Sequence, residues 1–266
     1  MTEAVKNPLA EQALIVAAGR GSRMRGMTED APKCLVELAG KSLLEWQISA
    51  LKSAGLSDVA AVGGYLNERL RPFIDVAFVN SDWSRTNMVS TMICATSRLR
   101  AAATVISYSD IVYNRNIVDA LRSSEGDIVV AYDRHWLDLW SSRFDDPLDD
   151  AETFRIRDGR ISEIGATPNS VAEVEGQFMG LMKIEPRGWR AIEDLLSGIS
   201  KAKRDRMDTT GLLNLLIKDG IKVCGCPIDG GWVEVDTETD LSCYERCLEQ
   251  SLATGQAWSH DWRSRI

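Results

Sequence analysis

A strand-length apolar run that ends in a glycine-rich, basic loop, at residues 14–33, constrains this chain more than any other stretch. Its sequence is LIVAAGRGSRMRGMTEDAPK. An apolar run that passes into small residues predicts a buried parallel strand. Such a strand delivers its loop to the carboxyl edge of an α/β sheet, where sheets of this kind bind ligands. We therefore expect an α/β fold with a ligand site at this loop.

The loop has the chemistry of a polyphosphate site. Ala17 and Ala18 leave room for a planar group against the backbone. Gly19 and Gly21 let main-chain N–H groups turn toward an anion. The positive charge comes from four side chains, namely Arg20, Arg23, Arg25 and Lys33. We expect the loop to hold a polyphosphate.

Two common phosphate-loop patterns do not fit. A dinucleotide fingerprint needs a third glycine, where this chain has Met24. A Walker A loop needs a lysine where this chain has Met27. The remaining pattern is a strand followed by Ala-Ala-Gly-x-Gly-[Ser/Thr]-Arg, a short gap and Pro-Lys.

That pattern resembles the nucleotidyltransferases that activate sugar phosphates and small alcohol phosphates. With the downstream features, the chain is most similar to cytidylyltransferases that act on phosphocholine and alkylphosphonates such as 2-aminoethylphosphonate. The resemblance implies a contact of Lys33 with the α-phosphate and of Arg23 with the departing phosphates. It implies nucleotide binding by Ala17, Ala18, Gly19, Gly21, Ser22, Arg23, Gly64, Asn87 and Ser90.

The composition is that of an ordinary globular protein. The chain has 266 residues, 44% of them hydrophobic, and a formal net charge of -8. This length can bury the core of one large α/β domain or of two joined halves. The acidic balance disfavours a nucleic-acid or anionic-membrane surface. No stretch approaches a membrane span, and residues 1–12 lack a secretory signal pattern.

The six cysteines are dispersed along the chain. Cys224 with Cys226 and Cys243 with Cys247 could be imagined as a zinc site. However, the first pair shares one face of a predicted strand and the second has helical spacing. We expect reduced, packed cysteines and a cytoplasmic protein. The oligomeric state stays open, with a homodimer as one alternative.

Strands and helices alternate along the chain. Ser42 with Glu45 predicts a capping box at the start of a helix that Gly55 ends. Asp158 and Gly159 predict a hairpin turn within 152–164.

We expect further strands at 34–38, 58–62, 76–79, 104–108, 127–132, 175–184, 221–226 and 232–235. We expect further helices at 90–99, 114–121, 186–196, 209–218 and 238–251. This rhythm predicts a Rossmann-like, doubly wound, mostly parallel mixed sheet. We expect one domain over 1–266, with a nucleotide-binding half (1–133) and an acceptor and metal half (134–266).

Two strand-end carboxylates are candidates for a Mg²⁺ site. Asp110 follows the strand at 104–108, and Asp236 follows the strand at 232–235. Mg²⁺ prefers one or two carboxylates together with waters and phosphate oxygens. Either aspartate alone could equally be a cap or turn residue. The resemblance assigns both to the metal, since 234–241 is similar to a metal motif of these transferases.

Aromatic and acidic residues predict the acceptor pocket. Trp136 and Trp140 have i, i+4 spacing and would share one helical face beside carboxylates, which suits an ammonium group. The alternative is a hydrophobic plug between the halves.

Relatives in the sugar branch carry Glu-Lys-Pro, whose lysine holds the acceptor phosphate, where residues 163–168 of this chain lack lysine. Another cation must then hold that phosphate, and the candidates are Arg134, Arg143 and Lys183. The predicted acceptor site comprises Arg134, Trp136, Trp140, Arg143, Phe178 and Glu234.

The reaction implied by the resemblance joins CMP from CTP to a small phosphonate or alcohol phosphate and releases pyrophosphate. Two alternatives stay open. One is a sugar-1-phosphate nucleotidyltransferase that uses UTP or dTTP. The other is a regulatory nucleotide-binding module without turnover, which would not require Lys33 and both aspartates.

Overall fold

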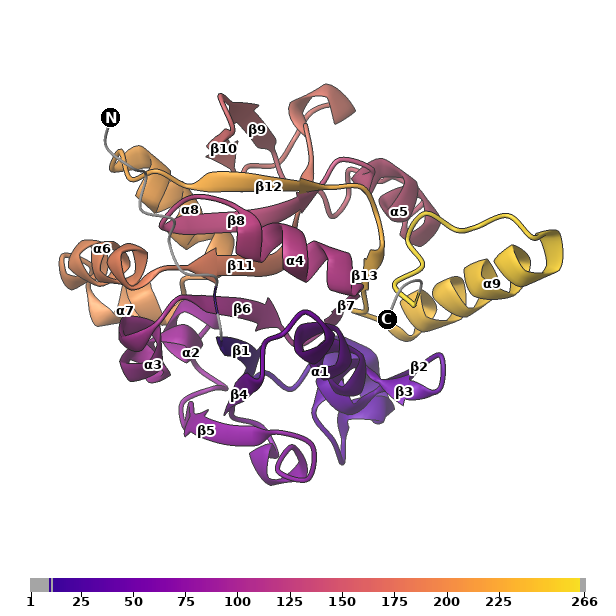
Figure 1. The fold of residues 1–266 in the computed structure, drawn as a ribbon, viewed down its shortest axis with the longest axis horizontal. Helices are drawn as coiled ribbons and strands as arrows, with labels where there is room; N and C mark the ends of the chain where they lie inside the picture. Colours follow the sequence, from indigo (N-terminus) through magenta and orange to yellow (C-terminus); the bar gives the residue numbers. More distant parts are fainter. Residues whose placement is uncertain (1–9, 11, 264–266) are drawn as a thin grey trace.

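The computed structural model describes residue 10 and residues 12–263, apart from the side chain of Arg25. The expectation for residues 1–12 therefore lies almost wholly outside the described residues. A sheet lies at the centre of the molecule (Figure 1), and it has nine strands. Its order is β5 (Asp75–Val79), β4 (Asp58–Gly63), β1 (Gln12–Ala17), β6 (Thr104–Tyr108), β11 (Gln177–Ile184), β8 (Ile128–Asp133), β12 (Cys224–Ile228), β10 (Arg160–Ile164) and β9 (Phe154–Arg157).

Most strands of this sheet point the same way. The pairs β5–β4, β4–β1, β1–β6 and β8–β12 are parallel. β11 is antiparallel to both β6 and β8, and β10 is antiparallel to both β12 and β9. Within the described chain, only β11 and β10 therefore run against the rest. The predicted mixed, mostly parallel α/β sheet is confirmed.

The helices form two layers. α1 and α4 contact each other and pack on one face of the sheet, whereas α2 contacts β1, β4 and β5 together with α7 and α8 on the other. Along the described chain the helices are α1 (Leu43–Ser53), α2 (Met88–Cys94), α3 (Thr96–Ala101), α4 (Arg115–Ser123), α5 (Trp136–Arg143), α6 (Pro186–Ser197), α7 (Lys201–Asp205), α8 (Thr209–Lys218) and α9 (Glu238–Thr254). None of the helices described is long and apolar enough to cross a bilayer.

Two short ladders and four 3₁₀ helices complete the part of the fold that the structure describes. β7 (Ile111–Tyr113) pairs with β13 (Trp232–Glu234), and β2 (Glu37–Leu38) pairs with β3 (Lys41–Ser42). The 3₁₀ helices are Ser22–Thr28, Lys33–Leu35, Asn67–Arg69 and Val171–Glu173. The β7–β13 ladder matters most, because it joins two segments that are far apart in the sequence.

Local sequence signals explain many of the element boundaries. The predicted capping box is present: the Ser42 side chain accepts from the backbone of Glu45, whose carboxylate accepts from the Ser42 N–H. The predicted hairpin at Asp158 and Gly159 joins β9 to β10. All six cysteines are free thiols, as expected.

Three predicted elements need correction. Residues 34–38 are not one extended piece, because backbone bonds to Pro32 and Lys33 close a 3₁₀ turn before β2. The helix predicted over 90–99 is broken at Ala95 into α2 and α3. The strand predicted over 221–226 begins only at Cys224, since the N–H of Ile221 bonds back to the end of α8.

Asp133, at the end of β8, is a buried hub that fastens the last part of the chain to the sheet. One carboxylate oxygen accepts from the backbone N–H groups of His135 (2.9 Å) and Gly230 (3.0 Å). The other lies 2.8 Å from the Trp232 indole nitrogen and 3.0 Å from Nε2 of His260. Burial alone would raise the Asp133 pKa, but the His260 and Gly230 contacts outweigh it and lower that pKa.

We expect Asp133→Asn to lower the free energy of unfolding by about 3 kcal/mol. The amide nitrogen of the asparagine cannot accept from the Trp232 indole, and a buried donor left without a partner costs about 1–3 kcal/mol before the lost charge is counted. Because the Asp133 pKa is lowered, its contribution is complete above about pH 4 and is lost as the pH falls through the folded-state pKa. Urea denaturation from pH 7 down to pH 3 measures both effects.

Asp229→Asn is the matched control, because Asp229 pairs with Arg134 at the surface. Exposed ion pairs contribute about 0–1 kcal/mol. Equal losses for the two variants would show that Asp133 is not a hub.

Candidate active site

The glycine-rich loop leaves β1 at the carboxyl edge of the sheet, as predicted. Ala17 and Ala18 are buried at the strand end. Gly21 has a φ of 74°, and a Cβ atom built on it would lie 2.6 Å from the Cβ of Lys33. The stem of Lys33 therefore packs directly over the Gly21 backbone, and only glycine provides both the conformation and the space.

Residues that directly follow the neighbouring strand β4 brace this loop. The Tyr65 hydroxyl donates to the carbonyls of Thr28 (3.0 Å) and Glu29 (2.6 Å), and its backbone N–H donates to Ala18. A Cβ on Gly64 would lie 2.6 Å from the Ala18 carbonyl oxygen. The loop is thus held from β4 at both of its ends.

Lys33 connects the loop to the two predicted strand-end aspartates. Its Nζ lies 3.0 Å from Asp110 and 2.6 Å from Asp236, and its side chain is 8% exposed. Asp236 also pairs with Arg23 at 2.9 Å. Burial on its own would lower the Lys33 pKa, but the charges of Asp110 and Asp236 outweigh it and raise that pKa.

The β7–β13 ladder brings the acidic residues together. It pairs Ile111 with Glu234, and the N–H of Val235 donates to the Asp110 carbonyl at 2.9 Å. Carboxylate oxygens of Asp110, Glu234 and Asp236 consequently lie within 4.8 Å of one another. Burial and the neighbouring Asp236 raise the Glu234 pKa to about 7.

The residues present fit a divalent metal ion. The three carboxylates supply only oxygen ligands, which Mg²⁺ prefers. One Asp110 oxygen, Oδ1, is buried without a hydrogen-bond partner among the described residues. The expectation that Asp110 and Asp236 belong to a metal site is therefore supported, and Glu234 joins them as a third candidate ligand.

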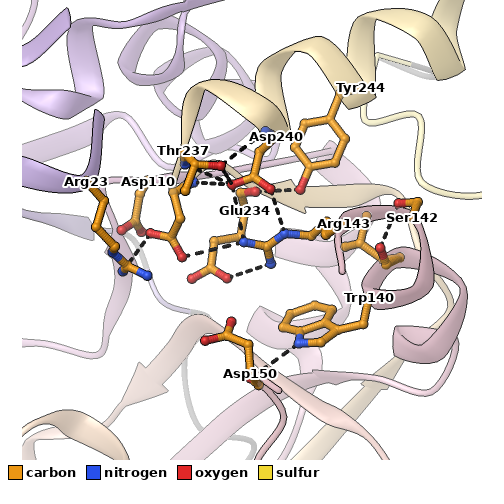
Figure 2. A network of polar contacts seen from close by, with 12 residues as sticks. Arg23, Asp110, Trp140, Ser142, Arg143, Asp150, Glu234, Thr237, Asp240 and Tyr244 are labelled. Atoms are coloured by element: carbon orange, nitrogen blue, oxygen red, sulfur yellow. Dashed lines mark hydrogen bonds and ion pairs between the residues drawn. The ribbon is translucent and has the colours of Figure 1, made fainter. Parts of the chain in front are cut away.

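Arg143 neutralises this cluster from inside the protein. Its side chain is 1% exposed and pairs with Glu234 at 3.0 Å and Asp240 at 3.1 Å. Figure 2 shows its guanidinium between these carboxylates, above Trp140. Asp240 also accepts from the backbone N–H of Asp236, which fixes the turn into α9. Arg143 thus organises the acidic residues, and it has no exposed group with which to hold an acceptor phosphate.

A cavity of about 360 Å³ opens beside the cluster. Its lining residues are Arg23, Tyr108, Trp140, Asp149, Asp150, Ala151, Glu152, Gln177, Phe178, Gly180, Thr210, Glu234 and Asp236. Arg23 is the sole cation among these described residues, against five carboxylates. Burial raises the pKa of both Asp150 and Glu152. The cavity therefore suits a small ligand that carries positive charge.

The structure brings only part of the predicted acceptor site to this cavity. Trp140, Phe178 and Glu234 line it. Trp136 contacts Trp140 edge-on at 6.3 Å, but it is buried and donates to the Val174 carbonyl, so it forms part of the hydrophobic core instead.

The other candidate cations also lie elsewhere. Arg134 pairs with Asp229 at the surface and does not line the cavity. Lys183 is bonded to the Ser124 carbonyl and lies beside Glu185. The backbone register places Lys183 opposite Val105, early in β6 and away from the strand end that carries Asp110.

The remaining predicted nucleotide contacts lie at the start of α2. Asn87 caps that helix, and its backbone N–H donates to the Asp205 carbonyl. The Ser90 hydroxyl lies 3.4 Å from the Asp205 carboxylate. Their contact with a nucleotide stays a prediction.

Sequence reasoning missed the loop that forms one wall of the cavity. Asp149, Asp150 and Glu152 follow α5, and the Trp140 indole donates to the Asp150 carbonyl at 3.3 Å (Figure 2). The acidic composition of 144–150 was visible in the sequence. A loop without periodicity, however, gave no indication of what it faces.

We expect Gly21→Ala to lower the free energy of unfolding by about 2–4 kcal/mol. A left-handed backbone in a non-glycine residue costs about 1–3 kcal/mol, and overpacking against Lys33 costs a similar amount. Gly26→Ala is the control, because Gly26 lies in the same loop with nothing within 4 Å of an added Cβ. Urea denaturation of both variants measures the difference. Equal stability would contradict the close packing of Lys33 on Gly21.

Known proteins are similar to this chain in sequence and in fold. The MobA-like NTP transferase domain model matches residues 13–165. CTP:phosphoglutamine cytidylyltransferase of Campylobacter jejuni is 36% identical over 248 residues, covering 86% of this chain and 97% of that protein. Choline-phosphate cytidylyltransferase of Streptococcus pneumoniae is 48% identical over 58 residues, covering 22% of this chain and 25% of that protein.

Among solved structures, the inositol-1-phosphate CTP transferase from T. maritima has the same fold. Its TM-score is 0.74 at 17% identity, and the match covers 95% of this chain and 100% of that one. Because the family model spans more than half of the chain and the Campylobacter relative aligns over nearly its whole length, this chain belongs to the MobA-like NTP transferase family and is a nucleotidyltransferase.

Proposed function

We propose that this protein is a CTP-dependent cytidylyltransferase that transfers CMP to a small, ammonium-bearing phosphate or phosphonate and releases pyrophosphate. The observation that carries the proposal is the position of Lys33. Its ammonium lies between the phosphate loop and the strand-end carboxylates Asp110 and Asp236, and Asp236 also lines the acidic cavity. The similarity to CTP-using relatives supports the choice of nucleotide.

The reaction needs no strong base. An anionic oxygen of the acceptor attacks the α-phosphorus of CTP and forms the new P–O bond. The bond from the α-phosphorus to the bridging oxygen breaks, and pyrophosphate takes the electron pair. The acceptor phosphate is already ionised near neutral pH, so no side chain has to remove its proton.

Positioning and charge stabilisation supply the catalysis in this scheme. Lys33 contacts the α-phosphate, where negative charge grows in the transition state. Arg23 is 65% exposed on its side chain and can turn toward the departing phosphates. The backbone N–H groups around Gly19 and Gly21 bind the phosphate chain.

Asp110, Glu234 and Asp236 would hold the Mg²⁺ ion that transferases of this kind use. When bound, a divalent cation there neutralises phosphate charge and aligns phosphate oxygens. Arg143 keeps two of these carboxylates, Glu234 and Asp236, in place from the interior.

The cavity supports an acceptor with an ammonium group. A phosphate that approaches the α-phosphorus lies near Arg23 and Lys33 at the mouth of the cavity. The rest of the acceptor then faces Asp150 and Glu152 together with the aromatic ring of Phe178. Carboxylates and aromatic rings attract ammonium groups. The Campylobacter relative is named for phosphoglutamine, and the free α-amino group of glutamine is an ammonium near neutral pH.

A substrate matrix tests the proposal. CTP, UTP, dTTP, ATP and GTP are each combined with phosphoglutamine, phosphocholine, 2-aminoethylphosphonate and glucose 1-phosphate, and pyrophosphate release is measured with Mg²⁺ or with EDTA. We expect Mg²⁺-dependent release with CTP and an ammonium-bearing acceptor. Turnover of glucose 1-phosphate with UTP or dTTP instead would overturn the proposal in favour of a sugar-1-phosphate nucleotidyltransferase.

We expect Glu152→Gln to raise the KM of the preferred acceptor by about ten-fold. A hydrogen bond to a charged group contributes about 1.5 kcal/mol, which corresponds to that factor. The KM of CTP should change less than two-fold, because Glu152 lies on the acceptor side of the cavity. Steady-state kinetics with each substrate varied in turn measure both constants.

Glu163→Gln serves as the control, because Glu163 is exposed on β10 and pairs with Arg155 away from the cavity. If Glu152→Gln behaves like Glu163→Gln toward every acceptor, Glu152 does not contact the acceptor.

A further inference from the structure

The contacts of Lys33 bear on when a metal ion can enter the site. Its ammonium is bonded to Oδ2 of Asp110 and to Oδ1 of Asp236. Both residues belong to the cluster whose oxygens lie close enough to share one ion. A cation of the protein itself therefore occupies one oxygen on each of two carboxylates that a divalent cation would bind.

The distances make the two cations competitors. A Mg²⁺ ion bonds carboxylate oxygen at about 2.1 Å. An ion on Oδ1 of Asp236, which lies 2.6 Å from the Lys33 ammonium, would be at most about 4.7 Å from it. The double charge of the Mg²⁺ ion and the single charge of the ammonium repel each other strongly at such a separation, because water reaches the site poorly.

Among the described residues, the hydrogen bonds of the Lys33 ammonium go to Asp110 and Asp236 alone. Its stem is confined by Gly21. Arg23 and Arg143 already add positive charge around Asp236. The ammonium can leave the carboxylates readily only when another anion attracts it, and the α-phosphate of a nucleotide in the loop is such an anion.

We propose that Lys33 is the resident counter-ion of the metal site and that it exchanges with the metal. In the nucleotide-free protein its ammonium holds Asp110 and Asp236. When a nucleoside triphosphate arrives, Lys33 transfers to the phosphate and the carboxylates become free for Mg²⁺. The metal therefore enters with the nucleotide and not before it. This rests on the proposed function in taking the carboxylates as the metal ligands and the α-phosphate as the second partner of Lys33.

Mn²⁺ binding without any nucleotide tests the exchange. Free Mn²⁺ is measured by electron paramagnetic resonance during titration of the full chain, as wild type and as Lys33→Met, Lys33→Arg and Lys41→Met. We expect Lys33→Met to bind Mn²⁺ at least ten-fold more tightly than wild type. Lys33→Arg keeps the charge, and Lys41→Met removes an exposed lysine that lies over Trp46, so neither should gain affinity.

The outcomes separate this inference from the proposed function. Equal or weaker Mn²⁺ binding by Lys33→Met would overturn the exchange, even if CTP turnover is found. Tighter binding would support it, even if the substrate matrix identifies another nucleotide. Should Lys33→Met fail to fold, Lys33→Gln keeps a donor to the aspartates without the charge, and the same ten-fold gain is expected from it.

Discussion

The burial of charge at the carboxyl edge of the sheet is the constraint on which the rest of the structure depends. Lys33 and Arg143 are nearly excluded from solvent, and each is surrounded by carboxylates. A buried charge without partners is very costly, so the acidic residues must be in place whenever the fold forms. The β7–β13 ladder and the capping box of α9 provide that placement through the backbone. Folding and assembly of the site are therefore one event.

Much of the fold could be predicted because local signals agree with the final contacts. Apolar runs gave the central strands, and the capping box of Ser42 and Glu45 marked the start of α1. The loop at residues 14–33, with Asp110 and Asp236, followed from the rule that parallel strands present their ends at one edge. These predictions depend only on the sequence close to each residue and on the direction of each strand.

The side of the site that forms the cavity could not be predicted in the same way. Arg143 was expected to hold an acceptor phosphate, yet it is buried against Glu234 and Asp240, residues some ninety positions later in the chain. Trp136 and Trp140 have the same spacing signal, but only Trp140 reaches the cavity. The choice between core and cavity is made by tertiary packing, which periodicity does not report.

The position of β11 has a consequence for how the protein can be made. β5, β4, β1 and β6 can pair as soon as residue 108 has left the ribosome, but the free edge of β6 pairs with β11. β8, although synthesised earlier, can join the sheet only through β11 and β12. During synthesis, the apolar edges of β6, which ends at Tyr108, and of β8, which ends at Asp133, therefore remain unpaired until β11 (Gln177–Ile184) has been added. Unpaired edges of this kind promote aggregation, so the nascent chain is most exposed to misassembly in that interval.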